Sequence, residues 1–124
     1  KQSIRLQNLD RNPVARVTSY GNLVITGSLV EGSGSTPGPN DFKVGYTLPE
    51  TEIEVITAWI DEQGNLHLKG KLHEEQLELQ PTGNSYLIQN RKGTNLGYFD
   101  RNTGELYLRG NLITGRSSED IRIE

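Results

Sequence analysis

The 124-residue sequence contains no cysteine and no methionine. Without cysteine the chain has no disulfide, no zinc–cysteine site and no thiol nucleophile. Without both residues it has no sulfur for oxidants to attack, which is compatible with a place outside the cell. The chain begins at Lys1 and not at Met, as a processed mature form or an excised domain would. We therefore expect an extracellular or cell-surface location.

Apolar residues and positive charge are also scarce. Apolar side chains make up 32% of the chain, and no apolar run approaches the roughly 20 residues needed to cross a membrane. Lys and Arg total 13 against 16 Asp and Glu, so the net charge is −3. Neutralising phosphates needs a basic surface. We expect one domain, no membrane insertion and no nucleic-acid partner.

What the sequence does have is one motif in three copies. Residues 21–29 read GNLVITGSL, residues 64–72 read GNLHLKGKL, and residues 104–112 read GELYLRGNL. The shared pattern is G-[NE]-L-x-[LI]-x-G-x-L, and its first glycines lie 43 and then 40 residues apart. Leucine or isoleucine alternates with mostly polar residues, which predicts a half-buried strand in each copy. The second glycine, on the apolar face, predicts either the close approach of another backbone or a bulge in the strand.

Turn signals separate short alternating runs along the whole chain, and no segment has helical periodicity. The predicted fold is all-β, with three repeats of about 40 residues forming a sandwich or barrel and a β-trefoil as the alternative. The repeats cover about residues 3–32, 41–80 and 85–115, and a terminal strand covers 120–124. In this division Ser3–Asn8 opens the first repeat, Leu23–Leu29 is one strand, and Gln76–Gln80 is a further strand of the second repeat.

The two ends of the chain resemble each other. Ile121-Arg122-Ile123 repeats the pattern of Ile4-Arg5-Leu6, so the sequence stops one strand into a fourth copy. Such a strand either closes its own domain or completes the sheet of a neighbouring copy. A head-to-tail contact of the second kind generates an open filament. The candidate subunit contacts are Ile4, Leu6, Ile121 and Ile123.

The repeated unit has an apolar-x-apolar-Gln-Asn strand such as Tyr86–Asn90, a strand ending near Asp61 or Asp100, and then the motif. It resembles β-hairpin repeats of bacterial and archaeal cell-surface and extracellular filament proteins. The first copy departs from it, with Thr18-Ser19 in place of the Asp. The resemblance implies a structural or adhesive role without catalytic residues. We expect a non-enzymatic subunit of an extracellular filament or surface fibre whose partners are copies of itself.

A carbohydrate-binding module or adhesin is the alternative, with surface glycans as partners. Aromatic and polar side chains near the motif strands suit the stacking and hydrogen bonding of a sugar. The candidate contacts are Trp59, Tyr86, Tyr107 and Arg109.

The sequence predicts no cofactor and no metal site. Asp61–Asn65 and Asp100–Glu105 fit calcium loops or hairpin turns, and we favour turns in which Asp bonds its own backbone. His67 lies on the predicted polar face of its strand with Lys69 and Lys71, so we expect it to be solvated rather than a ligand or a base.

Overall fold

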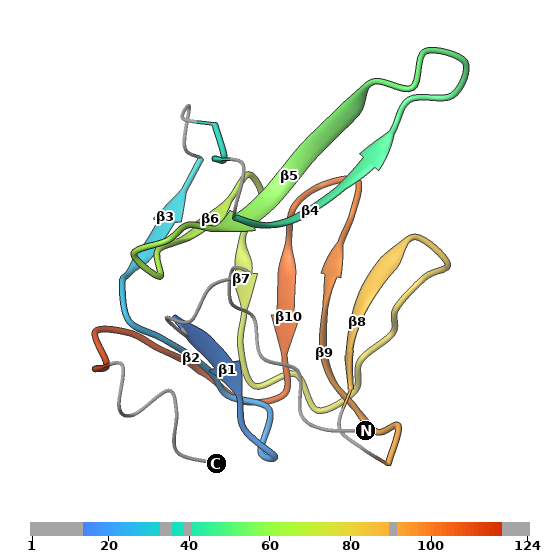
Figure 1. Ribbon diagram of the computed structural model, residues 1–124. Coiled ribbons are helices and arrows are strands. Elements are labelled where there is room, and N and C mark those ends of the chain that lie inside the picture. The colour runs from blue at the N-terminus through green and yellow to red at the C-terminus, as the bar shows by residue number, and fades with distance from the viewer. Residues whose placement is uncertain (1–13, 33–35, 39–40, 90–91, 118–124) are drawn as a thin grey trace.

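The computed structural model describes residues 14–32, 36–38, 41–89 and 92–117. In these ranges the chain forms eleven strands and no helix, which confirms the all-β prediction (Figure 1). The strands make three separate sheets, and none of the sheets closes into a barrel. No helix in the described part of the chain is long and apolar enough to cross a membrane.

Each sheet is antiparallel except for one parallel pair at its edge. Sheet A has the order β1 (Ala15–Val17), β2 (Leu23–Ile25), β11 (Leu112–Ile113). Sheet B has the order β4 (Phe42–Thr47), β5 (Glu54–Ile60), β6 (Leu66–Leu68), β3 (Leu29–Glu31). Sheet C has the order β8 (Ser85–Gln89), β9 (Asn95–Asp100), β10 (Leu106–Leu108), β7 (Leu72–His73).

Each motif copy is split between two sheets, so the prediction of one continuous strand per copy is wrong. The first copy supplies β2 to sheet A and β3 to sheet B. The second supplies β6 to sheet B and β7 to sheet C, and the third supplies β10 to sheet C and β11 to sheet A. The second strand of each copy is the parallel one, paired with the first strand of the next copy. The three sheets are therefore linked in a closed cycle.

The break in each copy falls at its second glycine. The N–H of this glycine donates to the carbonyl oxygen of the first glycine in the next copy: Gly27 to Gly64 (3.1 Å), Gly70 to Gly104 (3.3 Å) and Gly110 to Gly21 (3.0 Å). We call these three contacts the Gly–Gly junctions. A Cβ on the donor glycine would overlap Asn65, Glu105 and Asn22, respectively. The predicted close approach of another backbone is confirmed.

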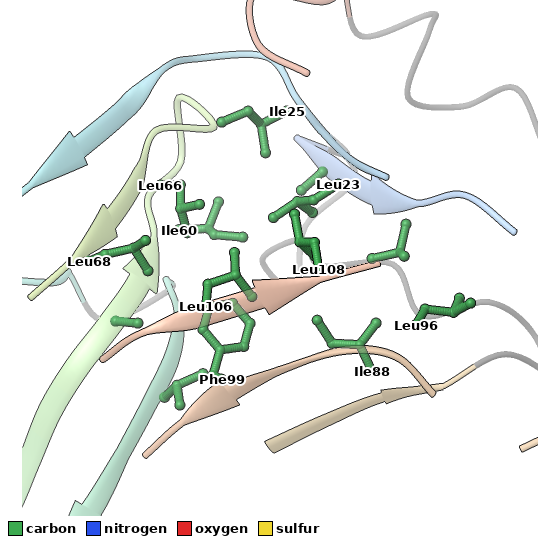
Figure 2. Close-up of a cluster of buried hydrophobic side chains, with 14 of the residues drawn as sticks. Leu23, Ile25, Ile60, Leu66, Leu68, Ile88, Leu96, Phe99, Leu106 and Leu108 are labelled. Carbon is green, nitrogen blue, oxygen red and sulfur yellow. The ribbon is translucent and has the colours of Figure 1, made fainter. Parts of the chain in front are cut away.

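The inward residues of the three sheets form one core (Figure 2). The alternating motif residues that the sequence placed inside are fully buried: Leu23, Ile25, Leu66, Leu68, Leu106 and Leu108. Ile60, Ile88 and Phe99 from the neighbouring strands pack with them. Each such side chain contributes about 1.5–3 kcal/mol by leaving water.

The strand predicted at Gln76–Gln80 is absent, since no residue of this described segment is in a strand. Gln76 still donates its N–H to the Leu108 carbonyl oxygen, but Leu77 is 87% exposed. Leu77 and Leu79 alternate with polar residues as strand residues do, but neither belongs to the hydrophobic core. The predicted strands at Ser3–Asn8 and 120–124 lie outside the described residues.

Two glycines with similar backbone geometry allow a matched test of close packing. Gly104 (φ 79°) and Gly93 (φ 85°) both have the left-handed conformation. A Cβ on Gly104 would overlap the Thr57 carbonyl oxygen of β5, whereas a Cβ on Gly93 meets nothing within 4 Å. We expect Gly93→Ala to cost about 1–2 kcal/mol through its conformation alone. Gly104→Ala should lose about 1–3 kcal/mol more through overpacking.

The free energies of unfolding of both variants are measured by urea denaturation. Equal losses would show that the contact between the turn at Gly104 and β5 does not constrain the fold.

Candidate functional site: a three-stranded sheet and two aromatic clusters

The outer side of β1 is the first candidate, because sheet A has three strands where sheets B and C have four. β5 and β9, which hold the place of β1 in their sheets, are paired on both sides. β1 pairs with β2, and no other strand of residues 14–32, 36–38, 41–89 and 92–117 pairs with it. The Val14 carbonyl oxygen accepts a hydrogen bond from the N–H of Thr26, which directly follows β2. Backbone groups in an antiparallel pair point alternately toward and away from the partner strand, so those of Ala15 and Val17 point away from β2. We call this side the β1 edge.

The second candidate is a cluster on the face of sheet B that points away from the core. The rings of Trp59 and His67 stack with centroids 4.6 Å apart and planes inclined by 6°. The Nε2 atom of His67 lies 2.9 Å from Oδ2 of Asp61. Trp59 is 2% exposed and His67 is 9% exposed. The expectation of a solvated His67 is therefore wrong, because the indole and the carboxylate hold its ring in place.

Asp61 connects this cluster to the turn between β5 and β6. Its Oδ1 atom accepts hydrogen bonds from the backbone N–H groups of Gln63 (3.0 Å) and Asn65 (2.9 Å). Burial acts to raise the pKa of Asp61. The hydrogen bonds from His67, Asn65 and Gln63 outweigh burial and hold the pKa below its ordinary value. Asp61 is therefore a carboxylate that organises both the turn and the histidine.

The third candidate is the corresponding cluster on sheet C. The ring of Tyr107 stacks on one side with His73 (4.4 Å between centroids) and on the other with Tyr98 (4.7 Å). The Tyr107 hydroxyl donates to Oε1 of Glu105 at 2.7 Å, and Nε2 of His73 lies 3.5 Å from the same oxygen. The hydrogen bond to Glu105, followed by burial, raises the pKa of Tyr107 to about 12. The phenol is therefore a neutral hydrogen-bond donor at physiological pH.

The four residues predicted to contact glycans do not form one surface. Trp59 belongs to sheet B, whereas Tyr86 and Tyr107 belong to sheet C. Tyr86 packs at 5.4 Å from the Phe42 ring, with the Arg101 guanidinium 5.4 Å above its own ring. Exposed Arg109 lines a separate hollow of about 160 Å³. A sugar-stacking platform needs an open ring face, but Trp59 is buried and both faces of Tyr107 are covered by other rings.

The two acidic turns have the hydrogen bonds of the predicted hairpin turns. Oδ1 of Asp100 accepts from the N–H groups of Asn102 (2.9 Å) and Thr103 (3.3 Å), as Oδ1 of Asp61 does in its own turn. Gly64 and Gly104 take positive φ angles of 85° and 79°. Within the described ranges, no group of three or more His, Cys, Asp or Glu residues is placed to hold a metal ion.

The predicted subunit contacts Ile4, Leu6, Ile121 and Ile123 lie outside the described residues. Sequence reasoning missed the pairing of Asp61 with His67. The only signal for it in the sequence is their position on either side of the turn at residues 62–65. That position also fits a pair of solvated side chains. No family model, curated protein or solved structure matches this chain.

The lowered pKa of Asp61 makes part of the stability depend on pH. At neutral pH, Asp61→Asn should cost about 1–3 kcal/mol, since a neutral amide accepts the turn and histidine hydrogen bonds less strongly. The folded pKa lies below the unfolded value, so the carboxylate's contribution is present above about pH 4 and lost as the pH falls through the folded pKa.

Urea denaturation at pH 7 and at about pH 2–3 measures this difference. The difference in free energy of unfolding between wild type and Asp61→Asn should narrow in acid. The control Glu78→Gln alters an exposed carboxylate, so its difference from wild type should be the same at both pH values. A gap of the same size at both pH values would contradict the assignment of Asp61.

Proposed function

We propose that the protein is a structural, non-enzymatic subunit of an extracellular filament or surface fibre, which assembles head to tail by exchange of a terminal strand. The β1 edge carries this proposal. In sheets B and C the corresponding edge is covered by β4 and β8. Beside β1 no strand of the described residues takes that place, although Ala15 and Val17 are buried. A sheet edge that lacks a partner strand invites pairing with another strand, and proteins normally cover or blunt it.

The sequence offers two strands for one place. β4 and β8 each direct two alternate apolar residues to the core side, Phe42 and Val44 in β4 and Tyr86 and Ile88 in β8. Residues 4–6 and 121–123 both have this apolar-x-apolar pattern. We read the chain as three related units of about 40 residues in a ring, followed by a surplus copy of the first strand. In this reading the chain has one strand more than its own sheets accommodate. A head-to-tail polymer requires such a strand, because each copy donates one to its neighbour.

The symmetry of such a contact determines the product. A terminal strand of one copy would bind the β1 edge of another, and these are different surfaces. A contact between unlike surfaces produces an open filament when its rotation does not close a ring. Main-chain hydrogen bonds would give affinity, and the two apolar side chains would fix the register. The glycan-binding alternative gains no support from the arrangement of its candidate residues.

Electron microscopy of the full-length chain tests the proposal. The wild type should form filaments, and a variant with Ser at Ile4, Leu6, Ile121 and Ile123 should remain a soluble protomer. Losing two buried apolar side chains per contact costs about 3–6 kcal/mol, which weakens the contact by a factor on the order of 10² to 10⁴.

The matched control has Ser at Arg5 and Arg122, which alternate with the apolar residues and should not disturb assembly. Circular dichroism checks that every variant is folded. Filaments from the variant without the four apolar residues, or none from the wild type, would rule out strand exchange.

A further inference from the structure

The hairpin of β4 and β5 extends well beyond the other strands as a two-stranded arm (Figure 1). β6 pairs with β5 only from Ala58 to Ile60, whereas β4 pairs with β5 from Ile60 out to Glu54. No further strand of the described residues pairs with the outer half of this hairpin. Every residue from 47 to 54 is exposed. We call residues 45–56 the β4–β5 arm.

One face of the β4–β5 arm is apolar. Tyr46 lies opposite Val55. The N–H of Leu48 donates to the Ile53 carbonyl oxygen at 2.8 Å, which places these two residues opposite each other. Opposite residues, and residues two apart along a strand, share one face, so the four side chains form a single stripe. At its outer end Leu48 is 37% exposed and Ile53 is 56% exposed, and an apolar stripe of this kind marks a binding surface.

The turn of the arm adds negative charge to the stripe. Glu50, Glu52 and Glu54 are all exposed. Glu50 (φ 76°) and Glu52 (φ 58°) take the left-handed conformation, which glycine adopts with less strain. The chain keeps carboxylates in both places, and backbone strain of this kind concentrates at binding sites. Two arms packed face to face would bring their glutamates together, so the surface that receives the arm has to be apolar and positive.

A surface with both properties surrounds Arg109. This exposed residue lines a hollow of about 160 Å³ together with Leu77 and Leu79, and Leu77 is 87% exposed. A Cβ at Gly21 would lie 2.8 Å from the Cβ of Arg109, and the preceding residue Tyr20 is 81% exposed. Within the described ranges no carboxylate forms an ion pair with Arg109. We call Tyr20, Leu77, Leu79 and Arg109 the Arg109 surface.

The arm and the Arg109 surface lie at opposite ends of the molecule. In Figure 1 the turn of the β4–β5 arm is at the top, whereas the β1–β2 turn, which carries Tyr20, and the end of β10, which Arg109 follows, are at the bottom. An arm therefore cannot reach the Arg109 surface of its own copy. The copy that it can reach is a neighbour in a head-to-tail arrangement, in which unlike surfaces meet.

We propose that the β4–β5 arm of one copy docks on the Arg109 surface of the next copy. The inference rests on the filament proposed above and adds a second contact between its subunits. Leu48 and Ile53 of the arm pack against the exposed leucines and Tyr20 of the neighbour. The Arg109 guanidinium pairs with a carboxylate of the turn, at Glu50 or Glu52, in a charge-assisted hydrogen bond. Tyrosine and arginine are the residue types that carry much of the binding energy in protein interfaces.

A charge exchange in the full-length chain tests the ion pair. Arg109→Glu alone, and Glu50→Lys with Glu52→Lys, should each raise the lowest concentration at which filaments form by about tenfold or more, because like charges then meet. Combining the three substitutions restores opposite charges and should bring that concentration back to about the wild-type value. Lys71→Glu, which reverses another exposed cation, is the control and should leave it unchanged. Sedimentation and electron microscopy measure assembly, and circular dichroism checks folding.

A second pair of variants tests the apolar stripe. Leu48→Ser with Ile53→Ser should raise the same concentration by about tenfold or more, since both side chains lose their apolar contact. Thr47→Ser changes the opposite face of the arm and is the matched control. If these two serines weaken assembly but Arg109→Glu does not, the arm binds elsewhere and the Arg109 surface is the wrong acceptor.

The outcomes separate this contact from the strand exchange. Filaments that form at the wild-type concentration in all of these variants overturn the docking of the arm and leave the proposed function standing. If the wild type forms no filaments, the proposed function fails. The docking then survives only as a concentration-dependent association in sedimentation velocity that Arg109→Glu abolishes and the charge exchange restores, and a strictly monomeric wild type overturns both.

Discussion

The fold depends on three backbone hydrogen bonds, the Gly–Gly junctions, which carry each motif copy from its own sheet into the next. At each junction a glycine N–H meets a glycine carbonyl oxygen of the following copy, and the third junction returns to the first copy. A side chain on the donor glycine would overlap the neighbouring segment. The contact therefore needs glycine at its centre and leaves no space for a substituent.

The junctions explain why each copy forms two short strands. A continuous nine-residue strand would keep all its residues in one sheet, and its second half would have to find a partner there. Breaking the strand at the second glycine sends Leu29, Leu72 and Leu112 to the next sheet, where each pairs in parallel with the first strand of the next copy. Because β11 pairs with β2, the described sheets are linked without help from a terminal strand. Cyclic linkage and the β1 edge are thus separate features of the molecule.

Sequence reasoning succeeded where a local pattern decides the structure. The alternation of Leu66 and Leu68 placed these residues in the core, and the Asp-to-Gly turns have the predicted hydrogen bonds. It failed where distant segments decide. The parallel pairing of β3 with β6 joins residues 37 apart in sequence, and no local signal specifies it. Leu77 and Leu79 alternate as strand residues would, yet Leu77 is 87% exposed and the two leucines line an open hollow on the surface.

The outer faces of the three sheets carry different residues at equivalent places. Trp59 lines a hollow with Thr36 and Pro37, the Tyr98 hydroxyl donates to the Gln80 carbonyl oxygen, and the two rings belong to residues that are 2% and 8% exposed. An aromatic ring at this place is shielded from water by the segment above it. Sheet A has Arg16 at the same place, and this residue is partly buried. The sheets therefore share the pairing of their motif strands but differ in the side chains that their outer faces bury.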